Sequence, residues 1–292
     1  MLTDQKRTIQ TVRSQYLGNR MRQLRERRGL ALAYVASYLG VEENTLARCE
    51  RAEWPFRRDH VAALLDAFEP TDDAARAGLL DLAQQVWRIN EWQHTDPLAD
   101  TPGGSGTVGE WWLLDRATEL HIYSQLLIPP AVQTRDYAQA VIRHTVQDPN
   151  RGDKLVRRVL DRQQALEDRK PPTRLEILID ESALSRPVGG RLVLQDQLRH
   201  LTYLAEQRPH VKIRVLPTGW HPGLDSAFTI SIPPRPYPPV ALVQHHGGQL
   251  IIEADAAAHY TKTFDRLHET AMSPAESSAL ISTLAEELPT HT

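Results

Sequence analysis

The sequence predicts an α+β protein with a small N-terminal domain of five helices and a larger C-terminal domain of mixed helices and strands. Three observations favour this class. The 292 residues suffice for two hydrophobic cores. Apolar residues recur at helical spacing through the first ninety positions. Short β-rich segments then cluster towards the end of the chain instead of alternating strictly with helices, which favours α+β over a doubly wound sheet.

The N-terminal domain is expected to consist of short helices joined by tight turns. The first helix spans 16–28, with Leu17, Met21 and Leu24 on its inward side, and Gly29 ends it. Gly40 is expected to supply the sharp turn after the second helix. The remaining helices are predicted at 31–40, 44–51, 59–70 and 71–89.

The predicted domain boundaries are 1–90 for the helical domain, 91–110 for a linker and 111–292 for the α+β domain. The linker prediction depends on HTDPLADTPGGSGTVG, which is rich in Gly, Pro, Thr and Asp and has almost nothing to bury. Strands are predicted at 121–128, 175–180, 211–217, 227–234, 240–245 and 249–254. Helices are predicted at 134–145, 152–168, 191–207, 255–271 and 273–288.

Composition and charge limit the function classes. Apolar residues make up 41% of the chain and charged residues 24%, without any apolar run long enough to cross a bilayer. A single cysteine, Cys49, excludes an internal disulfide and a multi-thiolate metal site. We therefore expect a cytoplasmic protein with no membrane partner. Residues 1–60 carry twelve basic and seven acidic side chains, whereas the remainder carries 22 and 30, so a polyanion contact is expected in the first sixty residues.

The segment LRERRGLALAYVASYLGVEENTLARCERAEWP resembles the lambda-repressor-like helix-turn-helix of the xenobiotic-response-element class, over roughly residues 17–68. Four features carry the resemblance: Arg25, Arg28 and Gly29 at the end of helix 1, Val35-Ala36 in helix 2, Leu39-Gly40 at the turn, and Glu50 late in helix 3.

The resemblance implies a DNA-binding domain. Arg25, Arg28, Arg57 and Arg58 would contact phosphates, whereas Asn44, Thr45 and Arg48 would read bases and Glu43 could accept a hydrogen bond from cytosine. Two departures stand out, because Ala33 replaces a common glutamine and the third helix opens on Glu42-Glu43. Acidic groups are favourable at a helix N-terminus but oppose the counterion release that drives DNA association.

From about 112 to 288 the chain resembles the uncharacterised C-terminal domain that follows this helix-turn-helix in antitoxin-like transcriptional regulators of antibiotic-producing soil bacteria. The motifs are IPPAVQTRDYAQAVI, LDRQQALEDRKPP, LIDESALSRPVGG, QLRHLTYLAEQRPHVKIRVLP, GWHPGLDSAFTISIP and AMSPAESSALI. The resemblance implies a small protein partner encoded nearby and control of development or secondary metabolism. Pro130-Ala131-Val132 and Gln244 depart from the usual pattern, which suggests a member with altered function.

Several polar groups in the C-terminal domain are candidate ligand-binding or catalytic residues. Gln133, Tyr137, Arg162 and Gln163 could converge on a small polar-aromatic ligand, or could tether helix to sheet. Asp180 and Glu181 end a strand, where Glu181 could act as a general base or either carboxylate could cap the next helix. The remaining candidates are Tyr123, Trp220, His221 and Asp225. The histidine spacing predicts no metal site, and no cofactor motif is present.

Three hypotheses follow from these patterns. The first is a cytoplasmic DNA-binding transcriptional regulator, a homodimer whose C-terminal domain senses a small molecule or a partner. The second is a regulator fold adapted as a cofactor-free cyclase or isomerase on a natural product, motivated by Ala33, the glutamate pair and Gln244. The third is an antitoxin-like protein that acts by contact with its small protein partner.

Overall fold

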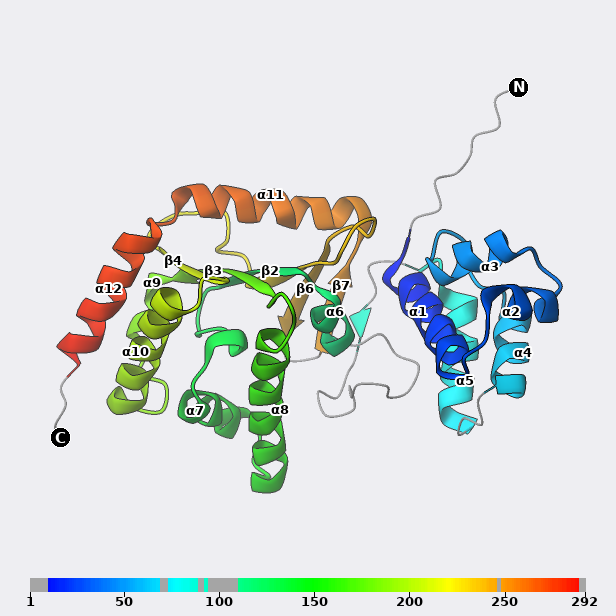
Figure 1. Cartoon of the computed structure of the whole chain (residues 1–292). Coiled ribbons are helices and arrows are strands. Elements are labelled where there is room, and N and C mark those ends of the chain that lie inside the picture. Colours follow the sequence, from blue (N-terminus) through cyan, green and yellow to red (C-terminus); the bar gives the residue numbers. More distant parts are fainter. Residues whose placement is uncertain (1–9, 69–72, 89–91, 94–109, 246–247, 289–292) are drawn as a thin grey trace.

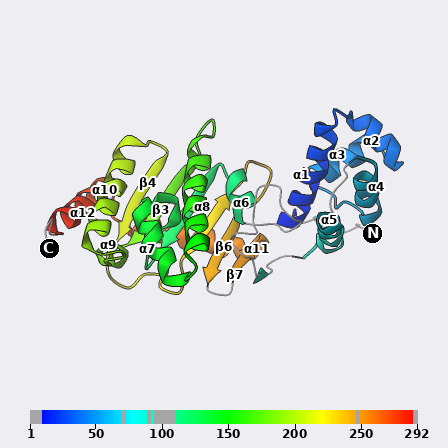
Figure 2. The same cartoon turned by 90° about the horizontal axis from the view of Figure 1, so that it is seen from below.

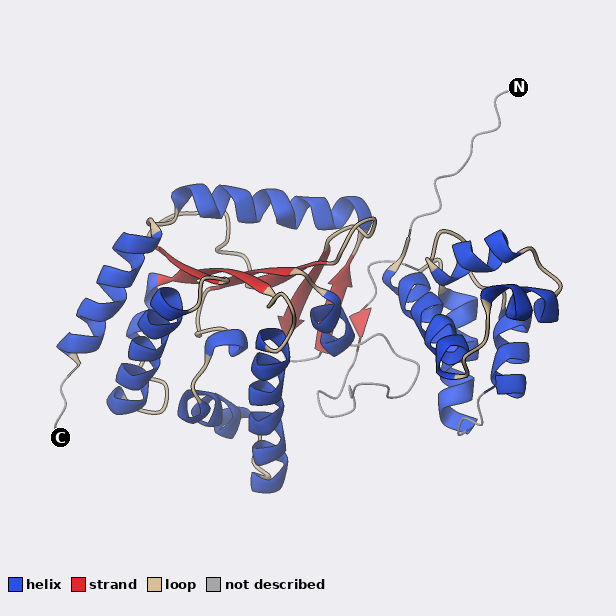
Figure 3. Cartoon of the chain, viewed as in Figure 1, coloured by secondary structure: helices blue, strands red, loops and turns tan. Residues whose placement is uncertain are grey.

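The computed structural model describes residues 10–68, 73–88, 92–93, 110–245 and 248–288. It confirms the α+β class, with an N-terminal helical domain beside a mixed sheet flanked by helices (Figures 1 and 3). Within these residues no helix is long and apolar enough to cross a membrane.

The N-terminal domain contains the five helices that the sequence predicts. They are α1 (Val12–Arg27), α2 (Leu32–Leu39), α3 (Glu43–Glu50), α4 (Arg58–Phe68) and α5 (Asp73–Gln85). Their core includes Leu17, Met21, Val35, Leu46 and Leu65, all buried. On α1 the buried residues Leu17, Met21 and Leu24 are three or four positions apart and share one face, which is why helical periodicity predicted this helix.

The C-terminal domain is built on a seven-stranded sheet with the order β1-β7-β6-β5-β2-β3-β4. The strands are β1 (Trp92–Gln93), β2 (Glu119–Ser124), β3 (Arg174–Asp180), β4 (Val211–Leu216), β5 (Phe228–Ile232), β6 (Val240–His245) and β7 (Gly248–Ile252). Strands β2, β3 and β4 run parallel, and the pairings of β5, β6, β7 and β1 are antiparallel. The parallel half has helices between its strands, whereas the late strands follow one another directly, which accounts for the mixed sheet.

Helices cover both faces of the sheet (Figures 1 and 2). The helical elements of this domain are α6 (Glu110–Arg116), η1 (Pro130–Val132), α7 (Arg135–Thr145), α8 (Pro149–Glu167), α9 (Glu181–Ser185), α10 (Arg191–Gln207), α11 (Ala254–Thr270) and α12 (Pro274–Glu287). Helix α11 lies on one face, where Phe264 and Leu267 pack with Tyr123 and Ile230. Helices α6, α8 and α10 lie on the other face (Figure 1).

The sequence-based elements differ from the structure at β2, α6, α9 and β1. The strand predicted at 121–128 begins at Glu119 and ends at Ser124, whose hydroxyl donates to the Leu127 carbonyl and closes a turn. The short helices α6 and α9 were not predicted, because fewer than eight residues give too little periodicity. Strand β1 lies inside the predicted linker and pairs with β7, Trp92 opposite Leu250.

The two domains share a continuous apolar contact. Leu113, Val240, Leu242 and Ile251 of the C-terminal domain belong to the same buried cluster as the helix-turn-helix core. Tyr16 of α1 packs against Trp112 of α6 in an edge-to-face arrangement, with ring centroids 5.2 Å apart. The sheet and α6 therefore support the helical domain directly.

Polar contacts reinforce this interface at the start of α1. Thr11 caps the helix, accepting from Ser14 N at 3.0 Å, and its hydroxyl donates to the Val86 carbonyl. The Val12 N–H donates to Glu253 Oε2 at 2.6 Å, so a carboxylate of the C-terminal domain satisfies a backbone group of α1. Burial raises the pKa of Glu253 to about 7, although the hydrogen bond from Val12 and the charge of Arg13 both act to lower it.

Candidate functional site

The first candidate site is the helix-turn-helix formed by α2 and α3. Gly40 ends α2 in the left-handed conformation, φ +68°, and its N–H donates to the Ser37 carbonyl at 3.1 Å. Val41 N–H donates to the Ala36 carbonyl at 3.0 Å. These bonds fix the turn, while Leu46 and Cys49 anchor α3 in the core. On the opposite side, α3 is exposed in its first turn, at Glu43 and Asn44.

The base-reading residues predicted on α3 occupy different environments. Glu43 and Asn44 are exposed in its first turn, and Thr45 is half-buried. Arg48 lies over the Trp54 ring, 4.0 Å from guanidinium carbon to ring centroid, and its Nε is 3.4 Å from Glu53 Oε2. Arg48 must leave this position to reach a base edge, whereas Asn44 is already directed to solvent.

The arginines predicted to contact phosphates also differ in accessibility. Arg25 forms a two-point ion pair with Glu50, Nε–Oε1 at 2.6 Å and Nη2–Oε2 at 2.7 Å. The hydrogen bond to Glu50 raises the pKa of Arg25, although burial acts in the opposite direction. This pair joins α1 to α3, so a phosphate contact by Arg25 would have to replace a scaffold contact.

The other three predicted phosphate contacts lie at the surface. Arg57 pairs with Asp59, Nη2–Oδ2 at 2.6 Å, and both side chains are exposed. Arg28 and Arg58 are exposed and make no ion pair within the part of the chain that the structure describes. They are therefore the predicted phosphate contacts that need no rearrangement.

Sequence reasoning missed two features of this domain. Tyr34 on α2 is exposed, and a tyrosine hydroxyl is a common donor to DNA phosphates. Gly18 on α1 approaches the backbone of α3 so closely that a Cβ there would lie 2.7 Å from the Cys49 carbonyl oxygen. A second exposed tyrosine, Tyr38, lies one helical turn after Tyr34 and is the signal that could have identified it, whereas nothing local distinguishes Gly18.

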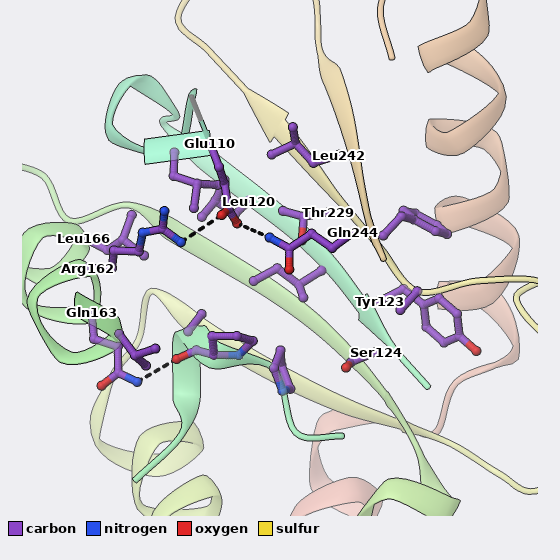
Figure 4. A pocket seen from close by; sticks show the side chains of 18 residues that line it. Glu110, Leu120, Tyr123, Ser124, Arg162, Gln163, Leu166, Thr229, Leu242 and Gln244 are labelled. Carbon is purple, nitrogen blue, oxygen red and sulfur yellow. Dashed lines mark hydrogen bonds and ion pairs between the residues drawn. The ribbon is translucent and has the colours of Figure 1, made fainter. Parts of the chain in front are cut away.

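The second candidate site is a cavity of about 160 Å³ in the C-terminal domain. It lies between strands β2, β5 and β6 and the helical elements α6, η1 and α8 (Figure 4). Its walls are mainly apolar, with Leu114, Leu120, Ile122, Leu166 and Leu242 among the lining residues. Mostly apolar walls with a few placed polar groups are the usual composition of a small-molecule site.

Two polar side chains of the cavity, Arg162 and Gln244, converge on the carboxylate of Glu110. Arg162 Nη1 donates to Glu110 Oε2 at 2.9 Å, and Gln244 Nε2 donates to Glu110 Oε1 at 2.7 Å (Figure 4). The Glu110–Arg162 pair is only about one-fifth exposed at each side chain. Sequence analysis singled out Arg162 and noted Gln244 only as a departure. It missed Glu110, which lay in the predicted linker.

Of the four residues predicted to surround a ligand, two line the cavity and two lie behind its wall. Arg162 and Gln163 line the cavity, but Gln163 Nε2 donates to the Pro130 and Gln133 carbonyls at 2.7 and 2.9 Å. Gln133 and Tyr137 are buried and do not line it. The Gln133 amide donates to the Ile128 carbonyl, and the Tyr137 hydroxyl accepts from Ile128 N–H. These contacts shape the segment that forms one wall.

Asp180 and His221 form a separate buried pair. His221 Nδ1 accepts from Gly223 N–H at 3.3 Å, so its ring proton lies on Nε2, which donates to Asp180 Oδ2 at 3.1 Å. Asp180 Oδ1 also accepts from Ser182 N–H at 2.9 Å and caps α9. Burial is the strongest influence on Asp180 and acts to raise its pKa, but the bonds from Ser182 and His221 together hold that pKa below its ordinary value.

The remaining predicted residues do not join Asp180 and His221 in a single catalytic group. The Tyr123 ring packs edge-to-face on His221, with centroids 6.0 Å apart, and burial raises the pKa of its hydroxyl. Tyr123 contributes to the cavity lining, but its phenol lies apart from the Glu110 group (Figure 4). Glu181 accepts from Thr218 N–H at 2.9 Å. Trp220 is 92% exposed, and Asp225 is also exposed.

The geometry of the two sites defines a class of protein, a helix-turn-helix DNA-binding regulator with an additional α+β domain. Comparison with protein families agrees, because residues 16–78 match a helix-turn-helix domain model. Residues 113–283 match the domain of unknown function DUF5753, and the chain belongs to that family. No curated protein and no solved structure matches the chain. The described residues contain no group of three or more side chains suited to hold a metal ion.

Proposed function

We propose that this protein is a cytoplasmic transcriptional regulator of the xenobiotic-response-element type, which binds duplex DNA through α2 and α3. The observation that carries the proposal is the exposed first turn of α3, held by the Gly40 turn in a domain that matches the helix-turn-helix model. In such domains the second helix of the motif enters the major groove. Asn44 would read a base there, while Arg28 and Arg58 would contact phosphates.

The proposal extends to assembly and biological role through the sequence resemblance. A homodimer would place two α3 helices on a two-fold operator, about one helical turn apart. The C-terminal domain would control DNA binding in response to a small molecule or to a small protein encoded nearby, with secondary metabolism as the regulated process. Light scattering of the protein bound to its operator duplex tests the dimer, because a complex with a single copy of the protein would contradict it.

The DNA-binding proposal is tested by fluorescence anisotropy with the full-length protein. The duplexes are the region upstream of its own gene and a scrambled sequence of the same composition, each titrated over a KCl series. Specific binding predicts a preference for the upstream duplex and a steep loss of affinity with salt. Equal binding of both duplexes at every salt concentration would contradict the proposal and favour the cyclase or isomerase hypothesis.

Three variants separate base reading from phosphate contact. Asn44→Ala is expected to lose about 1–3 kcal/mol on the upstream duplex with little effect on the scrambled one. Arg58→Ala is expected to weaken both duplexes equally and to reduce the salt slope by about 1. Arg191→Ala, an exposed arginine at the start of α10, is the matched control and should change neither.

A further inference from the structure

The cavity beside α6 contains a carboxylate that is held in the way a bound acid would be. Both oxygens of Glu110 accept hydrogen bonds, one from Arg162 and one from Gln244. The remaining walls offer apolar surface from β2, β5, β6 and α8. An apolar cavity of about 150 Å³ accommodates one benzene ring, so this volume fits a molecule with one ring or a short branched chain.

The two donors, Arg162 and Gln244, and the acceptor, Glu110, lie on different kinds of secondary-structure element. Arg162 lies on α8, a helix of 19 residues whose Leu166 belongs to the same buried cluster as Leu120 of β2. Gln244 lies on β6, where it pairs with Gln249 of β7. Glu110 is the first residue of α6, which has only seven residues. One donor is thus on a long helix and the other in a paired strand, so Glu110 on the short helix α6 is the group that can exchange at the smaller conformational cost.

We propose that the cavity binds a small monocarboxylic acid with an apolar body, and that the ligand carboxylate replaces Glu110 on Arg162 and Gln244. Arginine and an amide NH₂ are suitable donors for a carboxylate, and the charge-assisted bond to Arg162 is the stronger of the two. Glu110 thus acts as an internal substitute that keeps Arg162 neutralised in the absence of ligand. A cationic ligand is disfavoured, because both Glu110 oxygens already have donors.

Helix α6 connects this cavity to the DNA-binding domain. Glu110 and Leu114, one turn apart, line the cavity. On the same helix, Trp112 packs on Tyr16 of α1, and Arg116 lies over the Trp112 ring at 4.7 Å from its centroid. Release of Glu110 by a ligand would therefore shift the support of α1.

A second contact from the same region reaches the end of α3. Arg116 also lies over the Tyr237 ring at 5.0 Å, and the Tyr237 hydroxyl donates to the Arg51 carbonyl at 3.2 Å. Arg51 is the C-terminal cap of α3. The acid would consequently change DNA affinity, an effect that rests on the proposed function, by the typical coupling factor of about 5- to 150-fold.

The binding arm of the test uses the full-length protein without DNA. Benzoate, benzyl alcohol and benzylamine are titrated and followed by calorimetry, with benzoate expected to bind with a Kd on the order of 1 mM. Benzyl alcohol and benzylamine are expected to bind at least about tenfold more weakly, because neither provides a carboxylate for Arg162. Tighter binding of benzylamine than of benzoate, or no benzoate binding, would overturn the proposal.

Variants assign the binding to the cavity. Glu110→Gln removes the competing charge and should tighten benzoate binding about tenfold. The double variant Glu110→Gln/Arg162→Gln removes both members of the Glu110–Arg162 ion pair together, so it is expected to fold and to lose benzoate binding. Its melting temperature is measured alongside, and an exposed α12 carboxylate, Glu287→Gln, is the control. Unchanged benzoate affinity in the folded double variant would overturn the assignment.

The coupling arm repeats the DNA titration with saturating benzoate. The wild-type Kd for DNA should change at least about fivefold. Trp112→Ala should still bind benzoate, but its DNA affinity should no longer respond. Benzoate binding without any change in wild-type DNA affinity would overturn the coupling. A protein that binds benzoate through Arg162 but never binds DNA would refute the proposed function and leave the cavity assignment intact.

Discussion

Glu253 at the domain interface makes the stability of this protein depend on pH. Its carboxylate is buried against the first turn of α1 and accepts from Val12 N–H at 2.6 Å. Burial raises its pKa to about 7, from an ordinary value of 4.5. Glu253→Gln keeps an acceptor oxygen for Val12 and cannot ionise, so it isolates the contribution of the charge.

The magnitude follows from proton linkage. An acid whose pKa is higher in the folded state binds its proton more tightly there, so its contribution to stability is complete below pH 4.5 and is lost as pH rises to about 7. For this shift, the free energy of unfolding should fall by roughly 2–3 kcal/mol between pH 5 and pH 8. Above pH 8 the contribution is constant.

The assay is urea unfolding at pH 5, 6, 7 and 8, followed by tryptophan fluorescence. The wild-type stability, relative to Glu253→Gln, should decline by roughly 2–3 kcal/mol over this range. Removing the carboxylate also removes its attraction for Arg13. This loss lowers the stability of the variant by an amount that stays constant with pH above 7. The difference in slope is therefore the diagnostic quantity. Glu286→Gln, an exposed carboxylate on α12, should follow the wild-type profile.

Parallel pH profiles for wild type and Glu253→Gln would refute the reasoning. They would show that water reaches the carboxylate, or that the helical domain leaves the sheet before global unfolding. A profile in which wild type gains stability between pH 5 and 8 relative to the variant would reverse the sign and exclude a raised pKa.

Three further predictions concern the helix-turn-helix domain. Gly18→Ala should lower the free energy of unfolding in urea by about 1–3 kcal/mol, because the new Cβ would lie 2.7 Å from the Cys49 carbonyl oxygen of α3. Gly152→Ala on α8 is the control. Its Cβ would lie 3.8 Å from the nearest atom, Ile142 Cγ2, so this variant should be as stable as the wild type or more stable. Glu50→Gln should cost about 1–3 kcal/mol in thermal unfolding, because it leaves the half-buried Arg25 without its carboxylate. A cost no larger than that of an ordinary surface substitution would contradict this. Glu42→Gln should increase DNA affinity about two- to fivefold on all duplexes in low-salt anisotropy, because one negative charge near the phosphates is removed, and unchanged affinity would place Glu42 away from the DNA.

Part of the candidate site could be predicted because its residues belong to regular elements. Asn44 is exposed on α3, as its position in the helix-turn-helix pattern indicated, and Arg162 and Gln163 do line a cavity. Gln133 was predicted to face a ligand with them, but its amide is needed by the Ile128 carbonyl in a buried turn. A buried polar group must have a partner, and the sequence does not show which one is nearest.

The sequence by itself determined the helical domain, the strand segments and the α+β class, because helical and strand periodicity record which side of each element is buried. It also determined the turn at Gly40, because glycine has no Cβ and adopts the positive φ of this turn without strain. These properties depend on residues a few positions apart, so they can be read without knowledge of the rest of the chain.

Only the tertiary structure decided which polar groups meet. Glu110 and Gln244 are 134 residues apart, and Val12 and Glu253 are 241 apart. Their contacts arise from the strand order, which brings β6 and β7 beside α6 and α1. Apolar burial is non-directional and leaves a local pattern, whereas a hydrogen bond requires two atoms within about 3 Å, a condition that depends on the whole topology.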